Sequence, residues 1–263
     1  MGHSDSPTRG CRPDPLRTRC GRDLAKSLRT WNWVVAAVHG TSFLALLIIT
    51  LVNVGSLLSF PLWVDFGGVV TQLTTIPISS TLLPFPFITA GFHVAQALGV
   101  ANYYRTALVR GVTPHRWLEY MITNGLITVS VFALSGAGNV FLPVTGILLN
   151  ILMNFFGYLH EMANSKRQRT LAFVWWGFVP WLPLWYVPIA YFLASPVTLP
   201  VFYPVAIFGT FVFSFAFVAP LVYRYYTTSP EIVANYNVER AYLVLSLTAK
   251  LFLDWTVTIG AQF

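Results

Sequence analysis

The chain has 263 residues, of which 56% are hydrophobic, 16% aromatic and only 10% charged. So much apolar surface cannot be buried in one water-soluble core, so the composition excludes an ordinary soluble domain and predicts that lipid surrounds most of the chain. The formal net charge of +7 comes mainly from segments next to the predicted membrane spans. It is therefore a signal of membrane orientation and does not predict nucleic-acid binding.

Residues 1–30 carry no apolar run, and we predict that they form a basic, disordered cytoplasmic arm. No removable signal peptide is recognisable in this arm, so the first apolar helix is expected to act as the insertion signal. Both cysteines, Cys11 and Cys20, lie in the arm, where a reducing cytoplasm disfavours a disulfide bond. The first six residues, MGHSDS, fit an N-myristoylation pattern.

Residues 31–263 are predicted to form a membrane domain of seven helices, because apolar runs of about 20 residues, enough to cross a bilayer, recur along them. These runs stay apolar instead of alternating, so helices are predicted in place of a β-barrel. The second helix is expected to be shorter if residues 61–75 form a structured loop. The predicted helices are 32–55, 69–101, 115–136, 139–163, 171–194, 201–226 and 239–260. The predicted fold class is an all-α seven-helix bundle.

Basic residues are distributed unevenly between the two predicted membrane faces. Seven of the 16 Lys and Arg residues precede the first helix, and eight more lie in or next to the loops before helices three, five and seven. The loops of the opposite face hold none. Because positive charge stays on the cytoplasmic side, we predict a multi-pass protein of the cell membrane with a cytoplasmic N terminus and an extracellular C terminus.

The sixteenth basic residue, Lys250, lies about ten residues into the last helix, near the predicted centre of the bilayer. A charge at that depth is costly, so a buried lysine is usually functional and needs a partner. Asp254, one turn further along the helix, and Glu119 in the third helix are the candidate partners. Glu161 is expected at the cytoplasmic rim. Such a lysine can form a structural ion pair, bind an anion or form a Schiff base with an aldehyde.

Two motifs around these residues narrow that choice. The last helix reads ERAYLVLSLTAKLFLDW from Glu239 to Trp255, and the third begins RWLEY from Arg116 to Tyr120. Together they resemble the heliorhodopsins, seven-helix retinal proteins of inverted topology. The resemblance implies that Lys250 binds all-trans retinal as a protonated Schiff base, that Glu119 is its counterion, and that the protein is a photoreceptor of rhodopsin type. It also implies a homodimer.

The same resemblance implies further site residues. His39 and His93 would form a polar cluster on the cytoplasmic side of the Schiff base, and Ser246 lies one turn before Lys250. Asp254 departs from the family pattern, in which a small or apolar residue stands at that position, so it is either a second counterion or proton acceptor or a polar contact near the helix end. The expected members of the retinal slot are Tyr120, Asn124, Asn150, Met153 and Phe215, the last chosen from a row of four phenylalanines in the sixth helix. Four tryptophans of the fifth helix, Trp175, Trp176, Trp181 and Trp185, are expected to divide between the slot and the interfacial belt.

The leading functional hypothesis is a light sensor in which photoisomerisation of retinal drives a conformational change that is passed to a cytoplasmic or membrane signalling partner. The alternative is a light-driven or light-gated proton or ion transporter, which Asp254 keeps open. A transporter without chromophore is disfavoured because no inverted repeat or broken helix pair is evident. No P-loop, hydrolase triad or metal-ligand cluster is recognisable, so we predict neither an enzyme nor a metal site.

Overall fold

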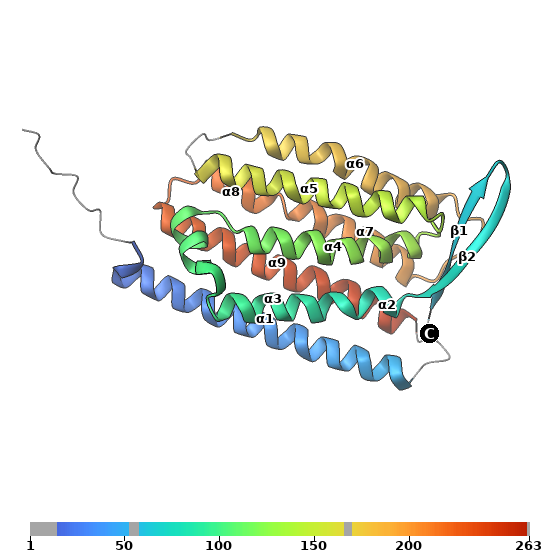
Figure 1. The fold of residues 1–263 in the computed structure, drawn as a ribbon, viewed down its shortest axis with the longest axis horizontal. Coiled ribbons are helices and arrows are strands. Elements are labelled where there is room, and N and C mark those ends of the chain that lie inside the picture. The colour runs from blue at the N-terminus through green and yellow to red at the C-terminus, as the bar shows by residue number, and fades with distance from the viewer. Residues whose placement is uncertain (1–14, 53–57, 166–169, 262–263) are drawn as a thin grey trace, which may run out of the picture.

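The computed structural model describes residues 15–52, 58–165 and 170–261. Its elements form one elongated bundle of helices with a β-hairpin projecting from one end (Figure 1). The main helices are α1 (Arg19–Val52), α3 (Pro84–Ala97), α4 (Pro114–Leu134), α5 (Phe141–Ser165), α6 (Ala172–Leu193), α7 (Phe202–Ala216), α8 (Ala219–Tyr226) and α9 (Glu231–Gly260). The hairpin consists of β1 (Ser59–Phe66) and β2 (Val69–Pro77), and the short helical elements are η1 (Pro15–Arg17), α2 (Ser79–Leu82), η2 (Val100–Asn102) and η3 (Arg105–Arg110).

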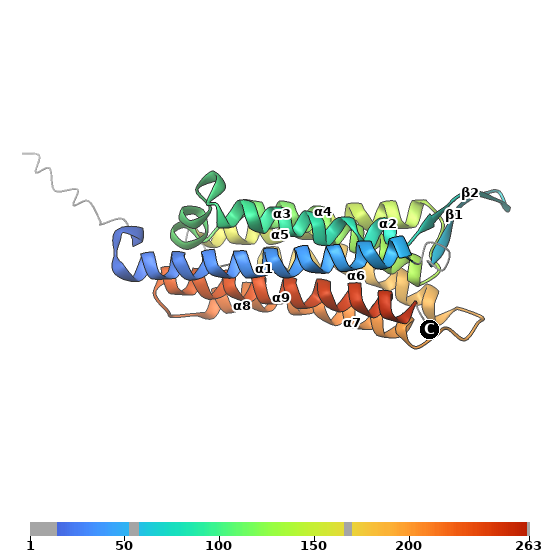
Figure 2. The ribbon, with the colours of Figure 1, turned by 90° about the horizontal axis from the view of Figure 1, so that it is seen from below.

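The predicted seven-helix membrane bundle is confirmed. Six spans in the described residues are long and apolar enough to cross a bilayer, and the count is seven when the bent pair of helices, 79–97 with 100–110, is taken as one span. Helix α1 lies along α3 and α9, and α4, α5 and α6 follow one another on the other side (Figures 1 and 2). The predicted bounds of the third, fourth and fifth spans agree with α4, α5 and α6 to within a few residues.

The two ends of the bundle differ in their chemistry. One end, which we call the arginine end, carries the N terminus of α1, the η2 and η3 segment, and exposed arginines that include Arg22 and Arg110. The other, the hairpin end, carries β1, β2 and the C terminus of α9 (Figure 1). Basic residues therefore collect at one end of the bundle, as the sequence predicted.

The predicted helix 69–101 was wrong over its first part, where β2 pairs antiparallel with β1. The expected alternative, a shorter helix after a structured segment at residues 61–75, is the one that the hairpin supports. Gly67 and Gly68 join the strands with positive φ angles of 63° and 88°, which a two-residue hairpin turn requires and glycine adopts without strain. The backbone of Trp63 pairs with Gly138 and Val140 in the loop before α5. The hairpin is thus anchored to the bundle, and the helical part of this span begins only at Ser79.

The predicted disorder of residues 1–30 was wrong from Pro15 onward, because η1 and the first three turns of α1 occupy this stretch. Leu28 is fully buried and packs with Leu108 of η3 and Leu243 of α9. The many basic residues suggested disorder, but the segment is an amphipathic helix, and these contacts stabilise its apolar side. Residues 1–14, with Cys11 and the myristoylation pattern, lie outside the described residues, and Cys20 is exposed with a free thiol.

Several helices are interrupted or longer than predicted. The chain bends by 90° between 79–97 and 100–110, so the expectation of no broken helix pair was wrong. The predicted span 201–226 divides into α7 and α8 near Pro220, which has no N–H to continue the helix. Helix α6 instead continues through three prolines. Helix α9 begins eight residues before its predicted start at 239, directly after Pro230.

Candidate functional site

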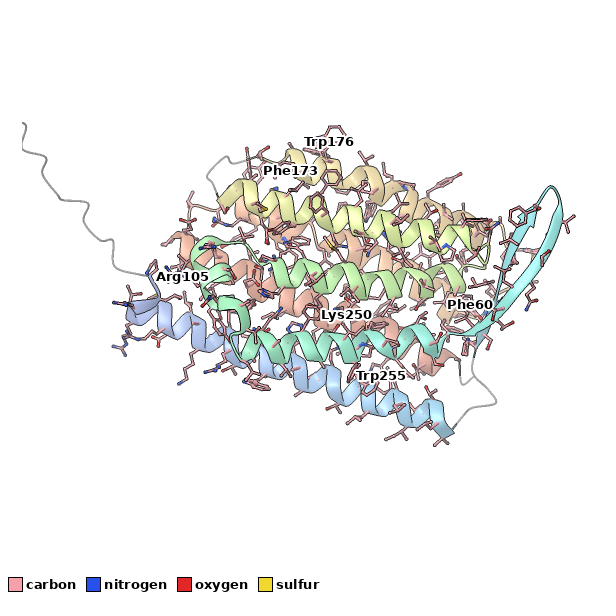
Figure 3. All side chains as sticks on the ribbon, viewed as in Figure 1. Phe60, Arg105, Phe173, Trp176, Lys250 and Trp255 are labelled. Atoms are coloured by element: carbon pink, nitrogen blue, oxygen red, sulfur yellow. The ribbon has the colours of Figure 1, made fainter. Side chains whose placement is uncertain are left out.

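Lys250 lies at the middle of the bundle (Figure 3) and is only 2% exposed. Its amine forms an ion pair with Glu119 of α4 and donates a hydrogen bond of 2.8 Å to the hydroxyl of Thr89 on α3. The amine also lies 5.4 Å from the centre of the Tyr120 ring. Lys250 and Glu119 therefore lie in contact, as the sequence predicted, and they form a buried pair of one positive and one negative charge.

The local sequence explains how these two side chains meet. Helix α4 begins at Pro114, which suits the first turn of a helix, and the buried residues that follow place Glu119 on the face toward α9. In α9, Ser246, Lys250 and Asp254 recur every four residues on one buried stripe. Side chains on a helix point toward its N terminus, so Lys250 extends toward the arginine end, where Glu119 receives it.

The predicted histidine cluster is also assembled. His39 of α1 and His93 of α3 stack with 6.5 Å between ring centres, and both are buried. Nδ1 of His93 is 2.8 Å from the side-chain oxygen of Asn32. His93 lies one turn closer to the arginine end than Thr89, the lysine's hydrogen-bond partner. The cluster therefore occupies the arginine-end side of the lysine.

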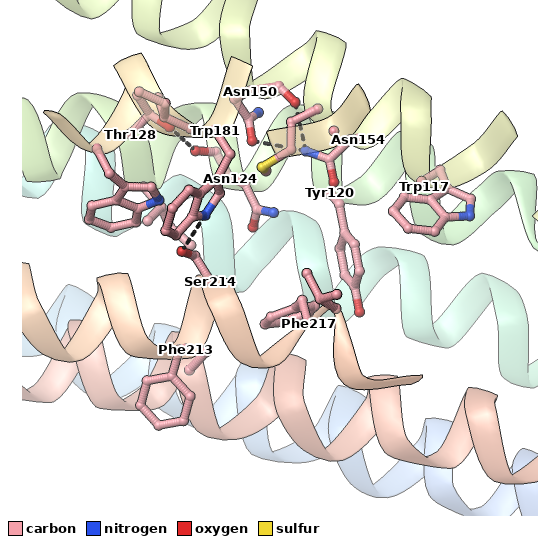
Figure 4. Close-up of a pocket in the computed structure, with 18 of the residues that line it drawn as sticks. Trp117, Tyr120, Asn124, Thr128, Asn150, Asn154, Trp181, Phe213, Ser214 and Phe217 are labelled. Carbon is pink, nitrogen blue, oxygen red and sulfur yellow. Dashed lines mark hydrogen bonds between the residues drawn. The ribbon is translucent and has the colours of Figure 1, made fainter. Parts of the chain in front are cut away.

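A cavity opens beside Lys250, between α4, α5, α6, α7, α8 and α9, and no described residue of α1 or α3 lines it. It contains about 1030 Å³ not filled by protein atoms, part of which is open to the surroundings. Its walls are mostly apolar and rich in aromatic side chains, with a few polar ones such as Asn124 and Ser214 (Figure 4). Lys250 is the charged residue among the described residues that line it. The indole of Trp181 donates a hydrogen bond of 3.0 Å to Ser214, which fixes one wall.

Most predicted slot residues lie in this cavity. Tyr120, Asn124, Asn150 and Met153 all line it. Ser246 is buried one turn from Lys250 but is not part of the lining. Phe215 was a wrong choice, because it is 55% exposed and turned outward, where it contacts Phe178 and Trp181.

Each of α6 and α7 turns one face toward the cavity and the other toward the outside of the bundle. Trp181 and Trp185 line the cavity, whereas Trp175 and Trp176 are exposed on the outside of the bundle. The four tryptophans therefore divide between the cavity and the surface. The predicted position of Trp175 and Trp176 in an interfacial belt stays a prediction. From α7 the lining takes Thr210, Phe213, Ser214 and Phe217. These positions share one side of a helix, because they are three or four residues apart.

Asp254 is completely buried and lies one turn, about 6 Å along the helix axis, from Lys250. Since α9 ends at the hairpin end, Asp254 is on the hairpin side of the lysine, opposite to the histidines. Neither carboxyl oxygen has a hydrogen-bond partner among the described residues. One of the two expected roles of Asp254 was a polar contact near the helix end. No described residue provides such a contact.

A second buried ion cluster, which sequence reasoning missed, lies closer to the arginine end. Arg116 of α4 forms ion pairs with both Glu161 of α5 and Glu239 of α9. Trp117 donates to Glu161 at 2.8 Å, and the guanidinium lies 4.0 Å from the ring centre of Tyr242. Glu161 is therefore buried, and its expected place at the rim was wrong. The motif residues Arg116 and Glu239 were the available signal for this cluster.

The comparison with known families agrees with the site geometry. The family model of heliorhodopsins matches residues 28–262, which is nearly the whole chain. The chain belongs to the heliorhodopsin family. Heliorhodopsins are retinal-binding proteins of rhodopsin type, they span the membrane several times, and the family is not one of the recognised enzyme families. No curated protein matches the chain.

The residues present fit a retinal chromophore. A primary amine at the cavity wall can condense with an aldehyde, and a largely apolar cavity with aromatic walls can enclose an apolar polyene. Gly157 lies against the ring of Trp117, and a Cβ there would come within 2.2 Å of it. Glycine at this position therefore lets Trp117 pack against α5 at the wall of the cavity.

Proposed function

We propose that this heliorhodopsin is a light sensor that carries all-trans retinal on Lys250 as a protonated Schiff base with Glu119 as counterion. The observation that carries the proposal is the buried lysine amine, which lies between an aromatic cavity and a single paired carboxylate. Arg116, the other buried cation, is a weaker candidate for binding the aldehyde. It already pairs with two glutamates, and a guanidinium forms no Schiff base with an aldehyde.

In this proposal retinal supplies light absorption and a change of shape, and the protein supplies the rest. Glu119 stabilises positive charge at the lysine nitrogen. The walls formed by Trp181, Phe213 and Phe217 hold the polyene in place and exclude water. Movement of these walls is passed along α4 and α9 to the ion cluster of Arg116, which joins both helices to α5.

The orientation and partners belong to the same proposal. The arginine end faces the cytoplasm and the hairpin end faces the outside of the cell membrane, in keeping with the distribution of positive charge. A cytoplasmic or membrane protein then receives the signal, the surrounding lipid is a further partner, and the protein acts as a homodimer without enzymatic activity of its own.

The deciding experiment is the absorption spectrum of the purified full-length protein after incubation with all-trans retinal. The parent is expected to form a visible band, and Lys250→Ala is expected to lose it completely. Lys26→Ala is the matched control, since Lys26 is exposed on α1, and it should keep the band. A visible band of parental size in Lys250→Ala would exclude the assignment.

The alternative is a light-driven or light-gated proton or ion transporter. The observation that favours it is the second buried carboxyl, Asp254, on the hairpin side of the lysine. Light-induced current in cells that express the protein separates the two functions. A sustained current that depends on Lys250 would support transport, and its absence would support a sensor.

A further inference from the structure

Asp254 is set apart from the other described acidic residues by its surroundings. It is 0% exposed, and no described donor lies within hydrogen-bonding distance of either carboxyl oxygen. Asp23 and Asp65, the other described aspartates, are exposed. The buried glutamates each have a cationic partner, since Glu119 pairs with Lys250, and Glu161 and Glu239 pair with Arg116. Asp254 alone among these buried acids lacks both a salt bridge and a donor.

The charges around Asp254 are already balanced without it. The charged group next to Asp254 on the buried stripe of α9 is Lys250, one turn away. Lys250 is neutralised by Glu119 from α4. The titratable residues of α1 and α3 near Lys250, His39 and His93, lie on its arginine-end side, opposite to Asp254, and the one titratable residue of α7 is Tyr203, near the first turn of that helix.

Ionisation of Asp254 would therefore place a second buried negative charge beside a pair that is already neutral. A buried ion without donors is strongly unfavourable, and such a group binds a proton instead. A neutral carboxylic acid is far less costly to bury. Both the burial of Asp254 and the charge balance around it therefore favour the protonated form of its carboxyl group.

We propose that Asp254 is a proton-binding site, distinct from the Lys250 and Glu119 pair, that holds its proton at neutral pH and exchanges it toward the hairpin end. Release of this proton to water leaves a carboxylate one turn from the lysine. The site then has proton-binding groups on both sides of Lys250, with the histidines toward the arginine end and Asp254 toward the hairpin end.

The first test does not depend on retinal chemistry. Infrared spectra of the full-length protein, with and without added retinal, are recorded at neutral pH after labelling of aspartate with ¹³C at the side-chain carboxyl. The expected result is a carbonyl stretch of a protonated carboxyl group that shifts with the label. Exposed carboxyls are ionised at this pH and give no such band.

Variants assign the band. It should disappear in Asp254→Asn and persist in Asp254→Glu as a band that no longer shifts with labelled aspartate. The control Asp65→Asn, which changes an exposed aspartate of the hairpin, should leave the band unchanged. Absence of a label-sensitive protonated carboxyl in the parent would overturn the proposal without recourse to any variant, so misfolding of Asp254→Asn cannot obscure the result.

The second test rests on the proposed function, because it uses the retinal band as the reporter. The parent should shift to shorter wavelength at alkaline pH as Asp254 becomes a carboxylate near the charged nitrogen, and Asp254→Asn should lack this shift. Identical alkaline titrations of parent and variant would contradict the proposal. Failure to form any visible band would instead refute the retinal assignment and leave the infrared result standing.

Discussion

Replacement of Arg116 by methionine should strongly destabilise the protein. The guanidinium pairs with two carboxylates, Glu161 and Glu239, and all three side chains are nearly inaccessible to solvent. Loss of the cation leaves both acids with neutral donors only, such as Trp117 for Glu161 and Tyr103 for Glu239. Removal of one partner from a buried ion pair costs about 3–5 kcal/mol. At about 2–4 °C per kcal/mol, this corresponds to a decrease in Tm of roughly 6–20 °C.

The assay is thermal unfolding of the detergent-solubilised full chain, followed by tryptophan fluorescence at one fixed scan rate, because membrane proteins commonly unfold irreversibly. Arg110→Met is the matched control, since Arg110 is exposed at the same end of the bundle. It should change the stability by about 0.5 kcal/mol or less. Equal decreases of Tm in Arg116→Met and Arg110→Met would refute the reasoning.

A combined variant separates charge from packing. Arg116→Met together with Glu161→Gln and Glu239→Gln removes the uncompensated negative charges, and it should recover most of the lost Tm. If the triple variant is as unstable as Arg116→Met, the cost comes from lost contacts, including the one between the guanidinium and the Tyr242 ring, and the electrostatic explanation fails.

Three further predictions concern the chromophore site and the orientation. Glu119→Gln in chloride-free buffer should shift the visible band to longer wavelength, because positive charge is held less firmly at the nitrogen; an unchanged spectrum would show that another group is the counterion. Phe213→Ala should reduce retinal uptake or shift the band, whereas Phe215→Ala on the outer face should match the parent, and equal effects would contradict the assignment of faces. A tag at the N terminus should be labelled only after the cells are permeabilised, and labelling of intact cells would reverse the proposed orientation.

The sequence was sufficient to predict the spans and the Lys250 and Glu119 neighbourhood, because hydropathy and two motifs report on them directly. The hairpin was missed because its strands are apolar enough to extend the following hydrophobic run. The Gly67 and Gly68 pair, flanked by apolar residues, was a local signal for a tight turn. The motif residues Arg116 and Glu239 were a signal for the ion cluster, but their contact with Glu161 could not be derived, since the three residues come from three helices whose mutual rotation is set by packing.

Helical geometry could have corrected the choice of Phe215. Residues two apart on a helix differ by about 200° around the axis, so neighbouring members of the phenylalanine row face opposite sides. Phe213 and Phe217 are four apart and share a face with Thr210 and Ser214. These two polar residues would be unfavourable toward lipid, which indicates that this face is the one turned inward. The structure places all four at the cavity and turns Phe215 away from it.

The two ion pairs between α4 and α9 connect the cavity to the arginine end. Arg116 and Glu119 are one turn apart on α4, whereas Glu239 and Lys250 are three turns apart on α9, about 16 Å along the axis. The same two helices are therefore joined at both levels only if Lys250 reaches back toward the arginine end, as the tilt of helical side chains favours. A change of charge at Lys250 would weaken one of these two ion pairs. The pair of Arg116 with Glu239 would then be the remaining one that fixes the offset of α4 along α9. In the proposed light sensor, a weaker link at Lys250 would let the two helices shift against each other, and this shift would alter the surface at the arginine end.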